Sequence, residues 1–172
     1  KAGKMATKSL LDAMPILHEL RLFKDDYEVA SLREAADISA AGHVKLMQRC
    51  QPGLYEYQLA ADFVHHCQYS GCKAMAYQPI AAAGANACTL HYVVNDAKLQ
   101  AGDLILIDAG GEYNNYAADI TRTFPINGKF TARQKELYEL VLAAQTKAIA
   151  AIKPGTTFDA LQAIILEVWL KG

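Results

Sequence analysis

The chain has 172 residues, of which 52% are hydrophobic and 20% are charged, with 17 basic and 18 acidic side chains. This length fits one ordinary domain with a buried core, and the apolar content excludes a disordered chain. A formal net charge of −1 removes any overall electrostatic case for binding nucleic acid or an anionic membrane surface. Since no apolar run approaches the roughly 18 residues that span a bilayer, we expect a soluble, cytoplasmic protein without nucleic-acid or membrane partners.

The beginning of the chain is expected to be an irregular linker that leads into two helices. Residues 10–23 are predicted to form a linker with a short strand, broken by its proline. Asp25 and Asp26 then offer N-caps for a long helix over about residues 27–49. A Gln-Pro-Gly stop follows, and a second helix is predicted over about residues 56–69.

After the second helix the pattern changes to short strands and then returns to helices. The strands are predicted around residues 77–81, 88–94, 104–109 and 116–124. Thr131 and Gln134 have the spacing of a capping box, which predicts a third helix from there to about residue 152. A fourth helix is predicted over about residues 158–170.

The four cysteines contain no C-x-x-C pair, which argues against zinc-ribbon and thioredoxin-type sites. Four are also too few for a disulfide scaffold in a chain of this size. We therefore expect reduced, mostly buried thiols at Cys50, Cys67, Cys72 and Cys88.

The helical regions share one pattern, in which Pro-Gly separates two helices. Pro52 and Pro154 lie at equivalent places in this pattern, 102 positions apart. If this is an internal repeat, each half consists of a helix, Pro-Gly, a second helix and then strands. The second half stops before its strands, so the sequence predicts a fragment of a longer domain.

Two carboxylates are the most informative residues. Asp108 ends the apolar strand at residues 104–107, and Asp119 lies eleven residues further on, in the next predicted strand. A hairpin with a two-residue turn at Tyr113-Asn114 would place Asp108 directly opposite Asp119. Their side chains would then project from the same face of the sheet, with Cβ atoms ~5 Å apart.

Two carboxylates that face each other repel, and a divalent cation bound between them removes the repulsion. Hard carboxylate oxygens bridge Mn, Co or Zn readily, and two such ions ~3.5–4 Å apart can activate a water for hydrolysis. Thr121 and Thr123 share the face of Asp119 and could orient it. The alternative is that Asp108 merely ends a strand while Asp119 pairs with Arg122 in solvent.

His91 is the third candidate residue, expected within the strand at residues 88–94. A single histidine in a strand is often only structural, and that interpretation stays open here. The sequence contains no zincin, serine-hydrolase or phosphate-loop motif, which argues against those classes of enzyme.

With these residues in place, the chain resembles the pita-bread metallopeptidases, and among them most closely the Xaa-Pro aminopeptidases. The resemblance covers nearly everything after about residue 15. The stretches that carry it are Arg21-Leu22-Phe23-Lys24, Leu90-His91-Tyr92, Leu106-Ile107-Asp108-Ala109-Gly110 and Asp119-Ile120-Thr121-Arg122-Thr123-Phe124-Pro125-Ile126-Asn127-Gly128.

The resemblance implies an α+β pita-bread fold, with two similar halves around a curved antiparallel sheet. Residues 1–20 would be the linker remnant of a missing N-terminal domain. Residues 21–172 would be the first half of the catalytic domain and the start of the second, which is truncated.

The resemblance also implies a reaction and a site. The family removes the N-terminal residue from peptides with proline in second position, using two divalent metal ions, usually Mn²⁺, and a metal-bridging hydroxide that attacks the scissile carbonyl. Two Asp, one His and two Glu hold the metals. Asp108 and Asp119 match the two Asp positions, and His91 matches a pocket histidine that helps to bind substrate and stabilise the tetrahedral intermediate.

The chain departs from this pattern, because nothing before Gly172 matches the family's metal-binding His and two Glu. We therefore expect the chain to bind manganese weakly, to cleave nothing alone, and to form a homo-oligomer through its uncovered sheet edge. The alternatives are a prolidase, which accepts only Xaa-Pro dipeptides, and a non-catalytic pita-bread module that binds peptides or partners.

Overall fold

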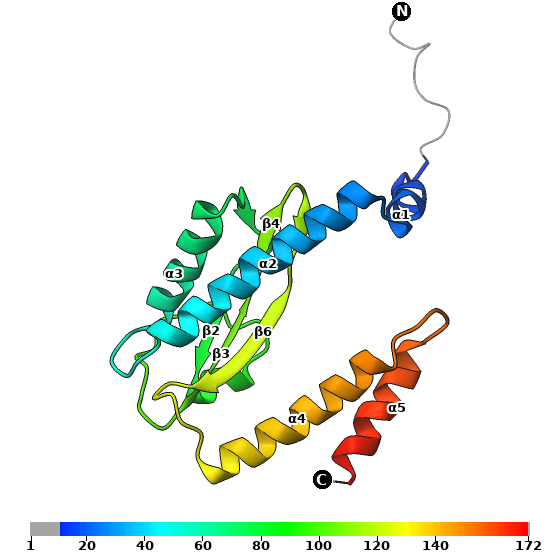
Figure 1. Cartoon of the computed structure of the whole chain (residues 1–172). Helices are drawn as coiled ribbons and strands as arrows, with labels where there is room; N and C mark the ends of the chain where they lie inside the picture. The colour runs from blue at the N-terminus through cyan, green and yellow to red at the C-terminus, as the bar shows by residue number, and fades with distance from the viewer. Residues whose placement is uncertain (1–10, 172) are drawn as a thin grey trace, which may run out of the picture.

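The computed structural model describes residues 11–171, which form helices and two small antiparallel sheets (Figure 1). The helices are α1 (Met14–Leu22), α2 (Asp26–Arg49), α3 (Glu56–Tyr69), α4 (Ala132–Ala150) and α5 (Phe158–Trp169). The strands are β1 (Ala74–Met75), β2 (Ile80–Ala83), β3 (Leu104–Ala109), β4 (Gly111–Tyr113), β5 (Tyr116–Ala117) and β6 (Ile120–Pro125). No helix within the described part of the chain is long and apolar enough to cross a membrane.

The prediction of a linker with a short strand at residues 10–23 is wrong, because α1 occupies most of this segment; residue 10 itself lies outside the described residues. Pro15 stands in the first turn of α1, where its missing N–H has no helical partner to lose. The Asp12 carboxylate accepts a hydrogen bond from the Met14 N–H at 2.9 Å and satisfies one free donor of that turn.

Helices α2 and α3 have the predicted bounds to within one residue and form one side of the core. Asp25 caps α2 through a capping box with Glu28, in which each side chain accepts from the other's backbone N–H at 2.8 and 2.7 Å. The helices cross closely at Gly42, where an added Cβ would lie 2.8 Å from the Phe63 ring. Figure 1 shows both helices covering one face of the strands.

The strands form two antiparallel sheets, with orders β2-β3-β6 and β1-β4-β5. Along β3 the side chains of Ile105, Ile107 and Ala109 are buried, whereas those between them are only half-buried. This alternation turns one face of β3 toward the core that α2 and α3 complete. The opposite face, which carries Asp108, is left for the site.

The predicted strand at residues 88–94 does not form. Gly84–Cys88 is a 3₁₀ turn, and the backbone that follows makes no ladder. The Asn95 side chain occupies the edge of β2, because its amide accepts from the Ala81 N–H and donates to the Pro79 carbonyl, both at 2.8 Å. A side chain thus takes the hydrogen bonds that another strand would have made.

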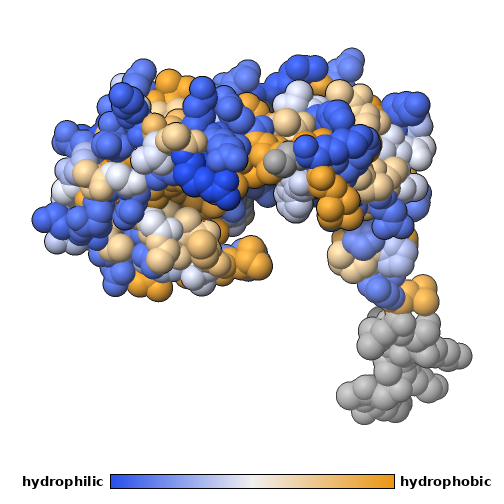
Figure 2. Space-filling model, turned by 90° about the horizontal axis from the view of Figure 1, so that it is seen from below, coloured by the Kyte–Doolittle hydropathy of each residue, from blue (hydrophilic) through white to orange (hydrophobic). Residues whose placement is uncertain are grey.

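Helices α4 and α5 pack on each other as a hairpin that starts from the predicted Thr131 capping box. The two Pro-Gly corners also match, since Gly53 and Gly155 have φ values of +95° and +88°. Of the two helices, only Ala144 is buried. Figure 2 views the chain from the side on which α4 and α5 lie in Figure 1, and apolar patches are visible among the polar residues.

The shallow packing of this hairpin predicts uneven stability along the chain. We expect backbone amides in α5 to exchange with deuterium much faster than those in β3, because α5 has no buried residue to resist local opening. Hydrogen exchange followed by mass spectrometry tests this. Protection of α5 equal to that of β3 would contradict it.

Candidate metal centre

The hairpin that carries the two acids has a register different from the predicted one. Asp108 pairs with Thr121 and not with Asp119, and the turn lies at Asn114-Asn115 and not one residue earlier. Both turn residues have positive φ, +50° and +65°, as a two-residue hairpin turn of this kind requires. Asn tolerates this conformation better than Tyr113 would, which explains the shift of two positions in the pairing.

The shift preserves the side-chain parity, and the two acids still meet on one face of the hairpin. The meeting point is the hydroxyl of Tyr77, which bonds the Asp108 carboxylate and lies 3.0 Å from the Asp119 Oδ1. Asp108 is half-buried and Asp119 is exposed. Burial and the hydrogen bond to Asp108 both raise the pKa of the Tyr77 hydroxyl, so Tyr77 remains a neutral donor.

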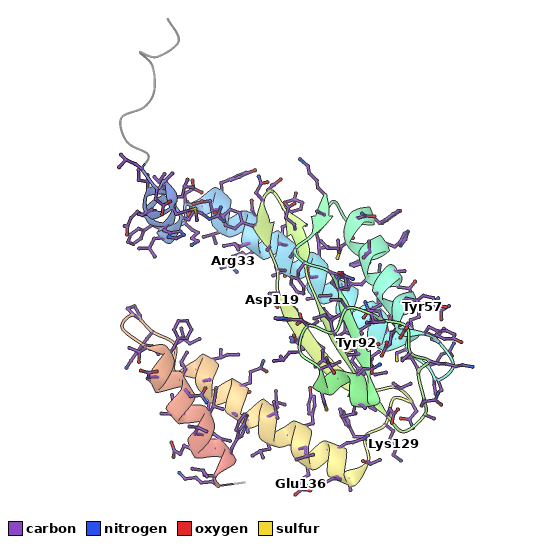
Figure 3. The ribbon with its side chains drawn as sticks, turned by 180° about the vertical axis from the view of Figure 1, so that it is seen from behind. Arg33, Tyr57, Tyr92, Asp119, Lys129 and Glu136 are labelled. Carbon is purple, nitrogen blue, oxygen red and sulfur yellow. The ribbon has the colours of Figure 1, made fainter. Side chains whose placement is uncertain are left out.

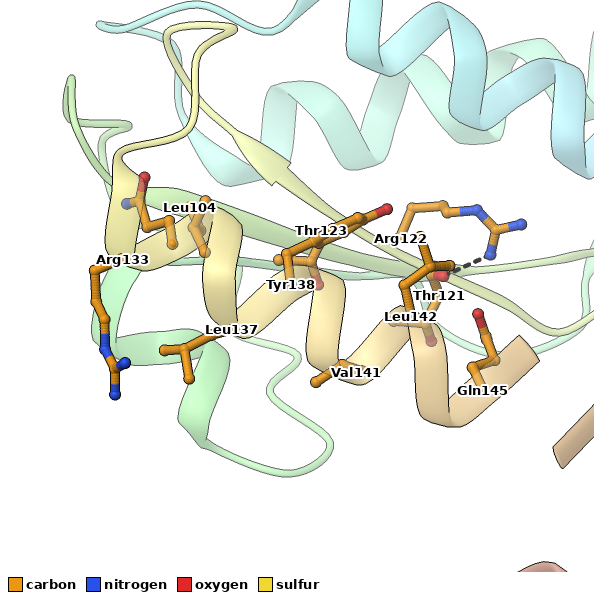
Figure 4. Close-up of a pocket in the computed structure, with 11 residues that line it drawn as sticks. Leu104, Thr121, Arg122, Thr123, Arg133, Leu137, Tyr138, Val141, Leu142 and Gln145 are labelled. Carbon is orange, nitrogen blue, oxygen red and sulfur yellow. Dashed lines mark hydrogen bonds between the residues drawn. The ribbon is translucent and has the colours of Figure 1, made fainter. Parts of the chain in front are cut away.

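The alternative interpretation, an ion pair between Asp119 and Arg122, does not form among residues 11–171. The Arg122 guanidinium instead donates to the Thr121 carbonyl at 2.8 Å (Figure 4). Neither acid forms an ion pair with any cation that the structure describes, and a single phenolic proton cannot be donated to both carboxylates at once. The two acids therefore retain oxygen atoms free to bind a positive charge.

These donors fit part of a divalent-metal site. Paired carboxylates are hard oxygen ligands of the kind that Mn²⁺, Co²⁺ and Zn²⁺ accept. However, residues 11–171 contain no group of three or more His, Cys, Asp or Glu side chains placed to hold an ion. The part of the chain that the structure describes thus offers two carboxylate ligands and not a full coordination shell.

A groove of about 510 Å³ lies between α4 and the strands (Figure 4). The strands contribute Leu104, Thr121 and Thr123 to its wall, and α4 contributes apolar side chains that include Leu137 and Val141. Neither carboxylate lines the groove, but Thr121 at its wall is the pairing partner of Asp108 on β3. The largely apolar groove and Asp108 are therefore joined through neighbouring strand positions.

His91 is exposed on a loop and not within a strand, with φ at +53°. It makes no hydrogen bond or ion pair with either carboxylate among the described residues, so the structure does not join it to the acids. Its loop is nevertheless anchored near Tyr77, because the Gln78 amide donates to the Val93 carbonyl at 3.2 Å. Figure 3 shows Asp119 beside the strands and Tyr92 on the adjoining loop.

Sequence analysis missed Glu56, a fully buried carboxylate in the first turn of α3. Its two oxygens accept four hydrogen bonds, from the N–H groups of Ala83 and Ala97, the Asn86 amide and the Tyr92 hydroxyl, at 2.7–3.1 Å. These bonds tie α3 to the loop that carries His91. Tyr77 was missed as well, since nothing in its local sequence distinguishes it from an ordinary aromatic residue.

Comparison with known proteins gives a consistent result. The profile of metallopeptidase family M24 matches residues 30–172. The Xaa-Pro aminopeptidase of Escherichia coli is 41% identical over 167 residues, which are 97% of this chain and 38% of that protein. The Xaa-Pro aminopeptidase of Haemophilus influenzae is 44% identical over 163 residues, which are 95% of this chain and 38% of that protein.

Solved structures agree with these relatives. Proline aminopeptidase P II from Yersinia pestis superposes with a TM-score of 0.91 at 46% identity, over 95% of this chain and 37% of that one. A zinc-substituted E. coli aminopeptidase P in complex with product also gives 0.91, at 41% identity, over 94% of this chain and 37% of that one. The match supports the expected α+β pita-bread fold over part of its length, and the chain spans less than two fifths of each protein.

The buried Glu56 carboxylate gives a testable prediction of stability. Glu56→Gln replaces one acceptor oxygen by an NH₂ group that faces donors, so we expect a loss of about 2–4 kcal/mol in the free energy of unfolding by urea. Glu136→Gln, at an exposed position on α4, is the control and should leave the midpoint almost unchanged. Equal midpoints for the two variants would show that the Glu56 hydrogen bonds do not stabilise the fold.

Proposed function

The chain belongs to metallopeptidase family M24, and on that premise we propose that it carries part of the active site of an Xaa-Pro aminopeptidase, a hydrolase that removes the N-terminal residue from peptides with proline in second position. The observation that carries the proposal is the convergence of Asp108 and Asp119 on the Tyr77 hydroxyl. Because the chain spans 38% of these relatives, the activity is proposed for the larger protein and not for this part alone.

Asp108 and Asp119 are the proposed metal ligands, and two Mn²⁺ ions are the proposed cofactor. The support is the chemistry of the donors: two adjacent carboxylates on the side of the sheet away from the core, with no ion pair to any cation among the described residues. When bound, divalent ions supply Lewis acidity that activates a water and polarises the scissile carbonyl. The Tyr77 hydroxyl, with one proton to donate, lies within hydrogen-bond distance of both carboxylates and so stands between them.

His91 is proposed to contact the substrate near its scissile carbonyl. Its exposure leaves the imidazole free for a ligand, while Glu56 restrains its loop through the hydrogen bond to Tyr92 at 2.8 Å. The apolar groove beside Thr121 lies on the face that would receive the peptide. The four free thiols are compatible with a reducing compartment, and we propose the cytoplasm.

No observation here favours the two alternatives. The relatives named above are Xaa-Pro aminopeptidases and not dipeptidases. A non-catalytic module would have no need to keep two uncompensated acids side by side. Xaa-Pro peptides longer than a dipeptide distinguish the proposed aminopeptidase from a prolidase, since a prolidase would leave them intact.

A titration with Mn²⁺ tests the proposed site directly. We expect the 172-residue chain to bind the ion weakly, as measured by electron paramagnetic resonance, and Asp108→Asn or Asp119→Asn to weaken binding at least about tenfold. Asp37→Asn removes an equal charge from the exposed surface of α2 and should change nothing. We also expect the chain alone to release no N-terminal residue from an Xaa-Pro peptide, because its described residues supply only the two proposed ligands.

Binding that survives both active-site substitutions, or that the Asp37 control weakens equally, would exclude these acids as the metal ligands. Steady peptide hydrolysis by the chain would exclude its proposed inactivity and would leave the ligand assignment to the titration.

We further propose that the chain forms a homo-oligomer. One support is the free edge of β6 within the described sheets. The other is the set of exposed apolar side chains on helices α4 and α5, among them Val141 and Phe158. Light scattering should show a mass that rises with protein concentration. A monomer of constant mass across the concentration range would contradict this.

A further inference from the structure

Two buried polar side chains on α2 reach the backbone next to the candidate metal centre. Ser39 and His43 are four residues apart and so lie on one face of the helix. The Gly111 N–H donates to the Ser39 hydroxyl at 2.9 Å, and that hydroxyl donates to the Ala35 carbonyl at 2.7 Å. The His43 Nε2 lies 3.1 Å from the Ala109 carbonyl oxygen.

The His43 hydrogen bond fixes the protonation of the ring. A carbonyl oxygen can only accept, so the proton resides on Nε2 and the imidazole donates to Ala109. Burial lowers the pKa of His43, which keeps the ring neutral. Neither Ser39 nor His43 faces solvent, and among residues 11–171 their hydrogen bonds near the acids go to the backbone of Ala109 and Gly111 and not to either carboxylate.

The backbone that they hold is the junction at which β3 gives way to β4. An added Cβ at Gly110 would lie 1.8 Å from the Ala118 carbonyl oxygen, so the two chain segments touch there. The Gly110 carbonyl accepts from the Ala76 N–H at 2.9 Å, and the Gly111 carbonyl accepts from the Ala118 N–H at 3.0 Å.

Each segment that meets at this junction carries one residue of the site. Asp108 precedes Ala109, Asp119 follows Ala118, and Tyr77 follows Ala76. A displacement of the junction would therefore move both carboxylates and the hydroxyl between them. Helix α2 is a firm support for the junction, because the His43 ring packs edge-on against Phe63 of α3 with centroids 5.1 Å apart.

We propose that Ser39 and His43 are positioning residues, which set the separation of the Asp108 and Asp119 carboxylates by fixing the Ala109–Gly111 backbone against α2. The proposal rests on the proposed function in that it takes these acids to be metal ligands. It assigns a role in metal affinity to two side chains that do not touch the metal. Outer residues that orient ligands typically change metal affinity 10–100-fold.

The test uses variants of the 172-residue chain, each of which changes one side chain that bonds to the backbone. His43→Leu removes the donor, whereas His43→Gln keeps an amide N–H that can reach the carbonyl. Ser39→Ala is a smaller change that removes the acceptor of the Gly111 N–H, so the proposal can still be tested if His43→Leu fails to fold. His66→Leu is the matched control, since His66 is also a buried imidazole with its Nε2 3.1 Å from a backbone carbonyl, that of Ile38, which lies outside the junction.

Two measurements are made on each variant. The first is the Mn²⁺ dissociation constant. The second is the ¹³C chemical shift of the Asp108 and Asp119 carboxyl carbons in the metal-free chain, which reports on their surroundings without any metal. Urea unfolding shows which variants are folded and how far each is destabilised.

We expect His43→Leu and Ser39→Ala to raise the Mn²⁺ dissociation constant about tenfold and to shift both carboxyl resonances. His43→Gln should restore most of the affinity. His66→Leu should lower stability but leave affinity within about twofold and both resonances in place.

Unchanged affinity and unchanged resonances in the folded His43 and Ser39 variants would overturn the proposal, as would equal losses in His66→Leu. If the wild-type chain binds no Mn²⁺, the proposed metal site fails. In that case the carboxyl resonances alone decide whether Ser39 and His43 position the acids.

Discussion

The close approach of Gly110 to Ala118 is the constraint on which the candidate site depends. Any side chain at Gly110 would meet the Ala118 carbonyl oxygen and force the two segments apart. Asp119 follows Ala118, and Asp108 lies two residues before Gly110, so this contact governs the separation of the carboxylates. The Tyr77 hydroxyl lies within hydrogen-bond distance of both acids, which is possible only while the segments stay close together.

Local patterns made helices α2 to α5 and their starts predictable, but not α1. The capping boxes at Asp25 and Thr131 involve residues only three positions apart, so they can be recognised without knowing the fold. The face shared by Asp108 and Asp119 was also predictable, because a shift of two positions in register preserves side-chain parity. The exact pairing was not, since it depended on which two residues could adopt positive φ in the turn.

Long-range contacts could not be predicted in the same way. Tyr77 and Asp108 lie 31 positions apart, and His43 and Ala109 lie 66 apart, so neither contact leaves a local signal. The loop of His91 resembled a strand because its composition is apolar and aromatic. Its backbone instead turns where the Asn95 side chain takes the hydrogen bonds at the edge of β2.

Two buried polar groups thus support different parts of the site. Glu56 fixes the loop of His91, and the Ser39–His43 pair fixes the junction beside the acids.

Anomalous X-ray diffraction from crystals grown with Mn²⁺ tests most directly the claim that Asp108 and Asp119 are metal ligands. The account predicts an anomalous peak bound by oxygens of both Asp108 and Asp119. A peak at any other residues, with the two carboxylates still bonded only to Tyr77, would contradict it.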